Sequence, residues 1–123
     1  MNTIPKSILI VDDSRVSRMM IRALMQARHP DWPLAEAGSG EDALREVREC
    51  HFDLITIDYN MPGMTGTELV EKLQAMGSKA RLVVLTANVQ EPLRRRVEAL
   101  GARFVKKPIN EQAIAEILAV LDA

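Results

Sequence analysis

The chain has 123 residues, of which 47% are hydrophobic and 27% are charged, and its formal net charge is −1. This length and composition predict one globular domain and exclude a disordered or collagen-like chain. The charge excludes the basic excess typical of nucleic-acid binders, no apolar run approaches the roughly 20 residues of a membrane span, and the single cysteine, Cys50, excludes an internal disulfide. We therefore expect a reduced, cytoplasmic monomer that neither binds nucleic acid nor inserts into membranes.

In chain order, five β-rich segments alternate with five segments of helical periodicity. The expected strands cover residues 7–11, 34–37, 52–57, 81–85 and 102–105. We expect the first helix to start near Ser14, three others to begin at the capping residues Ser39, Thr65 and Asn110, and the fourth to have Pro92 in its first turn. For the first helix, apolar periodicity predicts one face with Val16, Met20, Ala23, Leu24 and Ala27, and an opposite face with Arg15, Arg18 and Arg22.

This alternation predicts parallel strands joined by right-handed crossovers. Five units are too few for an eight-unit barrel. We therefore predict an α/β fold with a doubly wound, five-stranded parallel sheet, formed as a single domain by residues 1–123. In such sheets, ligands bind beyond the carboxyl ends of the strands, where the strand order reverses.

Reactive side chains follow four of the five expected strands: Asp12 and Asp13, Asp58, Thr86, and Lys107. If the strand order is 2-1-3-4-5, the ends of the first and third strands are neighbours, and their three carboxylates lie close together. Two carboxylates at about 4 Å repel by roughly 4 kcal/mol at an effective dielectric near 20, so the cluster needs a cation or a raised pKa. Carboxylate oxygens are the ligands that Mg²⁺ prefers.

A metal, a carboxylate, a hydroxyl and an ammonium in one pocket suit phosphoryl transfer, which depends on charge neutralisation and positioning. Asp58 is the better candidate for the acceptor, because it stands alone and a carboxylate can form an aspartyl phosphate. Asp12 and Asp13 are better metal ligands, because they are paired. Lys107 is long enough to reach across two strands toward Asp58.

These motifs resemble the receiver domains of bacterial two-component response regulators, over nearly the whole chain. They are Ile10-Val11-Asp12-Asp13-Ser14, Asp58 to Gly66, Thr86-Ala87 and Lys107-Pro108. The resemblance implies a flavodoxin-like fold of order 2-1-3-4-5 and is strongest to the single-domain, CheY-like chemotaxis members. It implies a phosphoacceptor switch rather than an enzyme, one that assists its own phosphorylation and dephosphorylation.

The resemblance also implies roles for individual residues. Asp58 is implied to accept the phosphoryl group from a sensor histidine kinase. Mg²⁺ is implied to bind Asp12, Asp13, Asp58 and the backbone carbonyl of Asn60. Lys107 is implied to pair with the phosphoryl group, while its neighbour on the strand points to the opposite face.

Two further residues are implied to carry the switch. Thr86 provides the switch hydroxyl, and Phe104 stands where the family has a rotating aromatic; as a Phe, it offers no phenol to a partner. Phosphorylation is expected to change the face formed by the fourth helix, the fifth strand and the fifth helix. Asn60 and Asn88 flank the implied path of the attacking water, which predicts a phosphoryl lifetime of seconds to a few minutes.

The sequence leaves the output open. A chemotaxis protein that docks on the flagellar motor is favoured over a phosphorelay intermediate that passes its phosphoryl group to a histidine phosphotransfer protein. Arg94, Arg95 and Arg96 either select the partner or are only solvated. An aspartyl-nucleophile phosphatase is the alternative from another class, but its signature has one residue between the two aspartates of the first strand. A flavin carrier of the same fold is disfavoured because Asp12 and Asp13 would repel its phosphate.

Overall fold

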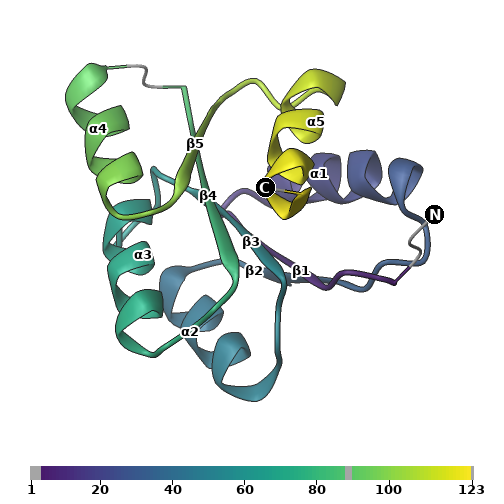
Figure 1. Ribbon diagram of the computed structural model, residues 1–123, viewed down its shortest axis with the longest axis horizontal. Helices are drawn as coiled ribbons and strands as arrows, with labels where there is room; N and C mark the ends of the chain where they lie inside the picture. The colour runs from purple at the N-terminus through teal and green to yellow at the C-terminus, as the bar shows by residue number, and fades with distance from the viewer. Residues whose placement is uncertain (1–3, 88–89, 123) are drawn as a thin grey trace.

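A computed structural model describes residues 4–87 and 90–122. Within them, five parallel strands form one sheet in the order β2-β1-β3-β4-β5, as predicted (Figure 1). The strands are β1 (Ile8–Val11), β2 (Leu34–Ala37), β3 (Leu54–Asp58), β4 (Arg81–Thr86) and β5 (Arg103–Lys106). The helices are α1 (Arg15–Arg28), α2 (Gly40–Glu49), α3 (Gly66–Ala75), α4 (Glu91–Ala99) and α5 (Glu111–Ala119), followed by the short 3-10 helix η1 (Val120–Asp122).

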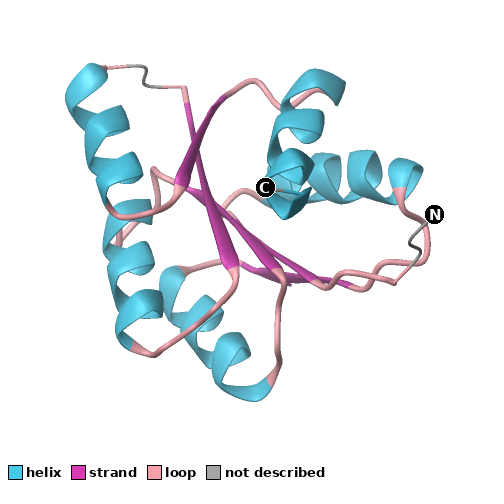
Figure 2. Ribbon diagram, in the orientation of Figure 1, coloured by secondary structure: helices cyan, strands magenta, loops and turns pink. Residues whose placement is uncertain are grey.

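The sheet is the middle of three layers (Figure 2). Helices α2, α3 and α4 cover one face, and α1 and α5 cover the other. Side chains alternate along each strand, so Leu9 and Val11 of β1 enter the core beneath α2 to α4, whereas Ile8 and Ile10 enter the core beneath α1 and α5. This double burial explains why the strands are apolar without a polar alternation.

Four of the helices begin with a side-chain cap, as predicted for three of them. Ser14, Ser39, Thr65 and Asn110 each accept a hydrogen bond from a backbone N–H in the first turn. Thr65 also forms a capping box with Glu68. Helix α4 has Pro92 in its first turn, and Gln90 at its N-cap makes no side-chain hydrogen bond to that turn. Among the described residues, no helix has the length and apolarity that crossing a bilayer requires.

The predicted orientation of α1 is wrong. Val16, Met20, Ala23 and Ala27 are exposed, and Ile21 and Met25 are the buried residues of the helix. The predicted face omitted Ile21 and Met25, although both are apolar, and it was therefore rotated away from the true buried face. Arg18 and Arg22 turn toward β2, where both pair with Glu36. Arg15 is exposed as expected, and Leu24 is half-buried.

Candidate functional site

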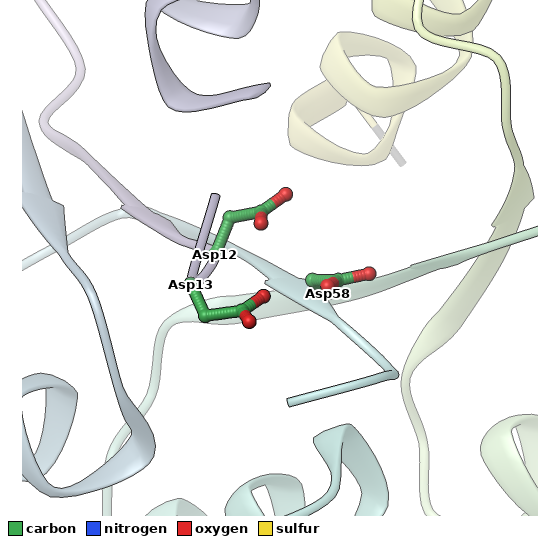
Figure 3. Close-up of side chains that lie close together, drawn as sticks. All are labelled: Asp12, Asp13 and Asp58. Atoms are coloured by element: carbon green, nitrogen blue, oxygen red, sulfur yellow. The ribbon is translucent and has the colours of Figure 1, made fainter. Parts of the chain in front are cut away.

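Three carboxylates meet at the carboxyl ends of β1 and β3 (Figure 3). Val11 of β1 is in register with Ile57 of β3, so the residues that follow, Asp12 and Asp58, are neighbours across the sheet. One carboxylate oxygen each from Asp12, Asp13 and Asp58 lies within 4.8 Å of the others. The expected cluster is thus formed at the point where the strand order reverses.

The three aspartates differ in burial. Asp12 and Asp58 are 1% and 5% exposed, whereas Asp13 is on the surface. Oδ1 of Asp12 accepts a hydrogen bond from the backbone N–H of Ser14 at 2.8 Å, but Oδ2 has no hydrogen-bond partner among the described residues. Burial, and then the charges of Asp58 and Asp13, raise the pKa of Asp12, against the Ser14 hydrogen bond and the Lys107 ammonium. The site therefore favours a cation close to Asp12.

Lys107 supplies one such charge. Its Nζ lies 3.1 Å from Oδ1 of Asp58 and 3.7 Å from Oδ2 of Asp12, so it reaches back across β4 as predicted. Its backbone N–H donates to the carbonyl oxygen of Thr86 at 2.9 Å, which fixes the strand end that carries it. The neighbouring Lys106 is exposed and, within the described residues, makes no ion pair.

The remaining predicted residues differ in burial and in position. Thr86 is fully buried at the end of β4, and Asn60 is exposed in the loop two residues after Asp58. Phe104 does not join the carboxylates: it is buried in the core beneath α2 to α4, with the guanidinium of Arg94 5.6 Å from its ring centroid. The prediction for Asn88 lies outside the described residues.

The donor set fits Mg²⁺. Three carboxylates are hard oxygen ligands, and Oδ2 of Asp12 is buried without a hydrogen bond that a metal would have to replace. Three ionised carboxylates and one ammonium leave two negative charges, which one divalent cation would neutralise. Cysteine and histidine are absent from this group, so it does not resemble a structural zinc site.

Sequence reasoning missed a contact beside the cluster. Arg18 was expected on a face away from the apolar one, yet its Nη1 donates to the backbone carbonyl oxygen of Asp12 at 2.6 Å. Glu36 of β2 holds the same guanidinium. The signal that could have revealed this was the pair Arg18 and Arg22, one helical turn apart, with a single acidic residue in the adjacent edge strand.

Comparison with known proteins agrees with this geometry. A profile of the response regulator receiver domain matches residues 8–119. The chain is 30% identical to chemotaxis protein CheY of Bacillus subtilis, over 90% of this chain and 92% of that protein. It superposes on chemotaxis protein CheY4 of Vibrio cholerae with a TM-score of 0.86 and 27% identity, covering 96% of this chain and 99% of that one.

Longer relatives match only in part. The chain is 33% identical over 84% of its length to the protein-glutamate methylesterase/protein-glutamine glutaminase of a Nocardioides species, of which it spans only 29%. The match to the receiver profile, by contrast, includes all five strands and all five helices of the described residues. The chain therefore belongs to the response regulator receiver domain family, and it is a CheY-like member of it.

Proposed function

We propose that residues 1–123 act as one receiver domain that accepts a phosphoryl group on Asp58 in a Mg²⁺-dependent reaction. The observation that carries this proposal is the position of Asp58, whose Oδ1 lies 3.1 Å from Nζ of Lys107 and whose carboxylate lies within 4.8 Å of those of Asp12 and Asp13. A carboxylate in this position has a cation beside it and two further carboxylates that could share a metal with it. It is therefore suited to carry the added negative charge of a phosphoryl group.

The transfer from a sensor histidine kinase is a displacement at phosphorus. An oxygen of Asp58 attacks, the new O–P bond forms an acyl phosphate, and the P–N bond of the donor phosphohistidine breaks with its electron pair left on the imidazole nitrogen. Lys107 then exchanges its ion pair with the Asp58 carboxylate for one with a phosphoryl oxygen. Mg²⁺, held by Asp12, Asp13, Asp58 and the Asn60 carbonyl, would supply neutralisation of the charge on the phosphoryl oxygens.

The change is then passed to the α4 side of the sheet. Val84 and Thr86 of β4 pair in register with Phe104 and Lys106 of β5, and alternation places Thr86 and Phe104 toward the same face. A shift of the Thr86 hydroxyl toward the phosphoryl group would alter the packing next to Phe104 and the start of α4. We therefore place the phosphorylation-dependent surface on α4, β5 and α5, where Arg94, Arg95 and Arg96 contribute to partner choice.

The surface beside the pocket supports transfer from a protein donor. Val16, Met19 and Met20 are 66%, 58% and 49% exposed, and together they form the α1 apolar stripe. The stripe begins three residues after Asp13. A contiguous patch of exposed apolar side chains is typical of a protein interaction site, whereas single exposed apolar residues are normal on any surface. A donor that covers this stripe would bring its phosphorylated side chain close to the acidic cluster.

Chemotaxis is the output that we favour, because the matched relatives include proteins named for it. The phosphorylated protein would then bind a component of the flagellar motor switch. The alternative output is a phosphorelay, in which Asp58 passes its phosphoryl group to a histidine phosphotransfer protein. Affinity capture with the phosphorylated protein distinguishes them: recovery of a motor component supports chemotaxis, and recovery of a phosphotransfer protein alone overturns it.

Intact mass tests the central proposal. Wild type and Asp58→Ala are incubated with a small acyl phosphate, with and without Mg²⁺. We expect wild type alone to gain the mass of one phosphoryl group, and only with Mg²⁺ present. A gain in Asp58→Ala would move the acceptor elsewhere. No gain in wild type with Mg²⁺ binding confirmed would refute the proposed chemistry.

A further inference from the structure

The guanidinium of Arg18 joins α1, β1 and β2 directly beneath the acidic cluster. Nη1 donates to the Asp12 carbonyl oxygen at 2.6 Å, and Nε donates to Oε1 of Glu36 at 2.9 Å. The side chain is only 17% exposed, so these are not contacts of a freely solvated arginine. The carbonyl that it binds belongs to the peptide between Asp12 and Asp13.

Arg18 is itself held in place. Oε2 of Glu36 accepts a hydrogen bond from Nε of Arg22 at 2.7 Å, and Arg22 also donates to the carbonyl oxygen of Leu34 at 3.1 Å. Burial alone would raise the pKa of Glu36, but the hydrogen bonds from Arg22 and Arg18 outweigh it and lower that pKa. Glu36 therefore stays ionised at neutral pH and anchors both arginines.

The backbone of Asp12 is held on both of its sides. The Asp12 N–H, in the peptide that precedes it, donates to the Ala37 carbonyl oxygen at 3.1 Å, and the Asp12 carbonyl, in the Asp12–Asp13 peptide, accepts from Arg18. Asp13, by contrast, is exposed, and its side chain makes no hydrogen bond or ion pair within the described residues. Its carboxylate is therefore aimed at the shared space by the backbone alone. Rotation of this peptide would move Asp13 away from Asp58.

We propose that Arg18 is a positioning residue for the divalent-cation site, which tightens metal binding by fixing the peptide between Asp12 and Asp13. This inference rests on the proposed function, because it assumes that the three aspartates bind a metal. Arg18 touches neither the metal nor the phosphoryl group. Its effect is that of an outer partner, and loss of such partners typically weakens metal affinity about 10- to 100-fold.

Arg22 offers a matched control. It lies on the same helix, pairs with the same Glu36 and carries the same charge, but the carbonyl that it binds belongs to Leu34, away from the cluster. Simple loss of positive charge near the site would affect Arg18→Ala and Arg22→Ala alike. A positioning role affects Arg18→Ala selectively. Arg18→Lys keeps the charge but cannot bridge two acceptors with a planar fork, so it separates charge from geometry and serves if the alanine variant fails to fold.

The experiment measures Mn²⁺ affinity by the electron paramagnetic resonance signal of free Mn²⁺, and amide hydrogen exchange of the metal-free protein. We expect Arg18→Ala to weaken Mn²⁺ binding about tenfold or more, Arg18→Lys to weaken it about as much, and Arg22→Ala to change it less than about threefold. In the metal-free state, Arg18→Ala should speed exchange at the Asp12 and Asp13 amides more than Arg22→Ala does.

Equal losses of Mn²⁺ affinity in Arg18→Ala and Arg22→Ala, or full affinity in Arg18→Lys, would show that Arg18 acts only through its charge. Either result would overturn the proposal. Unchanged affinity in Arg18→Ala would overturn it as well. Wild type tests the metal site, and the variants test the role of Arg18. Absence of Mn²⁺ binding by wild type removes the metal site itself, whereas loss of the predicted contrast between the variants removes only the role of Arg18.

Discussion

The two sides of the acidic cluster are constructed differently. On the β1–α1 side, Ser14 caps the helix and donates its N–H to Asp12, and Arg18 ties the adjoining carbonyl. On the β4–α4 side, the helix has no side-chain cap bond from Gln90, and Val97 is the one buried residue of α4 that the structure describes. The side that would bind the proposed metal is therefore held in place by more hydrogen bonds, and we expect the α4 side to shift at lower cost.

This difference separates recognition from response. A metal site gains affinity when its ligands are already in place, because little ordering remains to be done on binding. A switch needs an element with two arrangements of similar free energy. The β1–α1 side meets the requirement of a metal site, and the β4–α4 side meets the requirement of a switch. Both sides meet at Asp58, so a phosphoryl group on Asp58, as proposed, would contact both.

The largest effect should come from removing the cation that joins the two sides. Lys107→Ala leaves Asp12 and Asp58 without their ammonium, and we expect the metal-free protein to lose about 2 kcal/mol of unfolding free energy, since breaking a buried ion pair is costly. Phosphorylation should persist while partner binding is lost. Urea denaturation and partner titration measure these effects. Lys106→Ala, at the exposed neighbour, should leave the unfolding free energy unchanged.

Normal partner binding by phosphorylated Lys107→Ala would contradict the role of Lys107 in the switch, because the α4 side would then respond to phosphorylation without the ammonium. An unchanged unfolding free energy in Lys107→Ala would show that the cost of desolvating the ion pair already cancels the attraction between its charges. The stability of Lys107→Ala would be compared with that of Lys106→Ala, which controls for the removal of one lysine from the same strand end.

A smaller effect, of opposite sign, is expected on the fixed side. Since the pKa of Asp12 is raised in the folded protein, its ionised form destabilises the metal-free fold at neutral pH. That cost declines as pH falls through the raised pKa, and it is fully removed below the ordinary value of 3.8. Asp12→Asn should therefore stabilise the metal-free protein by about 1 kcal/mol at pH 7.

The difference in unfolding free energy between Asp12→Asn and wild type should shrink as the pH is lowered toward the ordinary value of the Asp12 pKa. Denaturation of both proteins at several pH values measures this difference. Glu36 and Asp53 have lowered pKa values, so their stabilising contributions decline only as pH falls below their ordinary values, and they are shared by both proteins. A pH-independent advantage would contradict charge crowding as its cause.

The smallest effect tests the looser side. Arg94 lies over the Phe104 ring, and such a contact at an exposed position is worth about 0.5–1 kcal/mol. We expect Arg94→Ala to lose about that much stability and to speed amide exchange in α4, but not in α1. Arg95→Ala is the control, because its guanidinium has no ring contact among the described residues. Equal exchange in α1 and α4 of Arg94→Ala would remove the proposed difference between the two sides.

Local chemistry explains which features the sequence predicted. The carboxylates of Asp12, Asp13 and Asp58 directly follow strands, so the strand order alone brings them together. Caps such as Ser39 and Thr65 are also local signals, which depend on residues within one turn. The strand order itself was informed by the family resemblance as well as by the alternation of elements.

Long-range polar contacts explain what the sequence did not predict. The partner of Arg18 is Glu36, which is 18 residues away in the chain, and apolar periodicity contains no information about such a partner. Helix α1 also has apolar residues on two faces: Ile21 and Met25 are buried, whereas Val16 and Met20 of the predicted apolar face are exposed. The contact of Arg18 with the Asp12 carbonyl could not be predicted either. Every residue has a backbone carbonyl, so the sequence does not indicate which carbonyl accepts a side-chain hydrogen bond.

The sheet order has a further consequence for self-association. Strands β2 and β5 are the two edges of the sheet, where unpaired backbone groups can template pairing between molecules. Each is four residues long and carries charge: Glu36 on β2, and the exposed Arg103 and Lys106 on β5. Short, charged edges disfavour the joining of two sheets into a continuous one. The edges of this fold therefore resist aggregation while the centre of the sheet carries the chemistry.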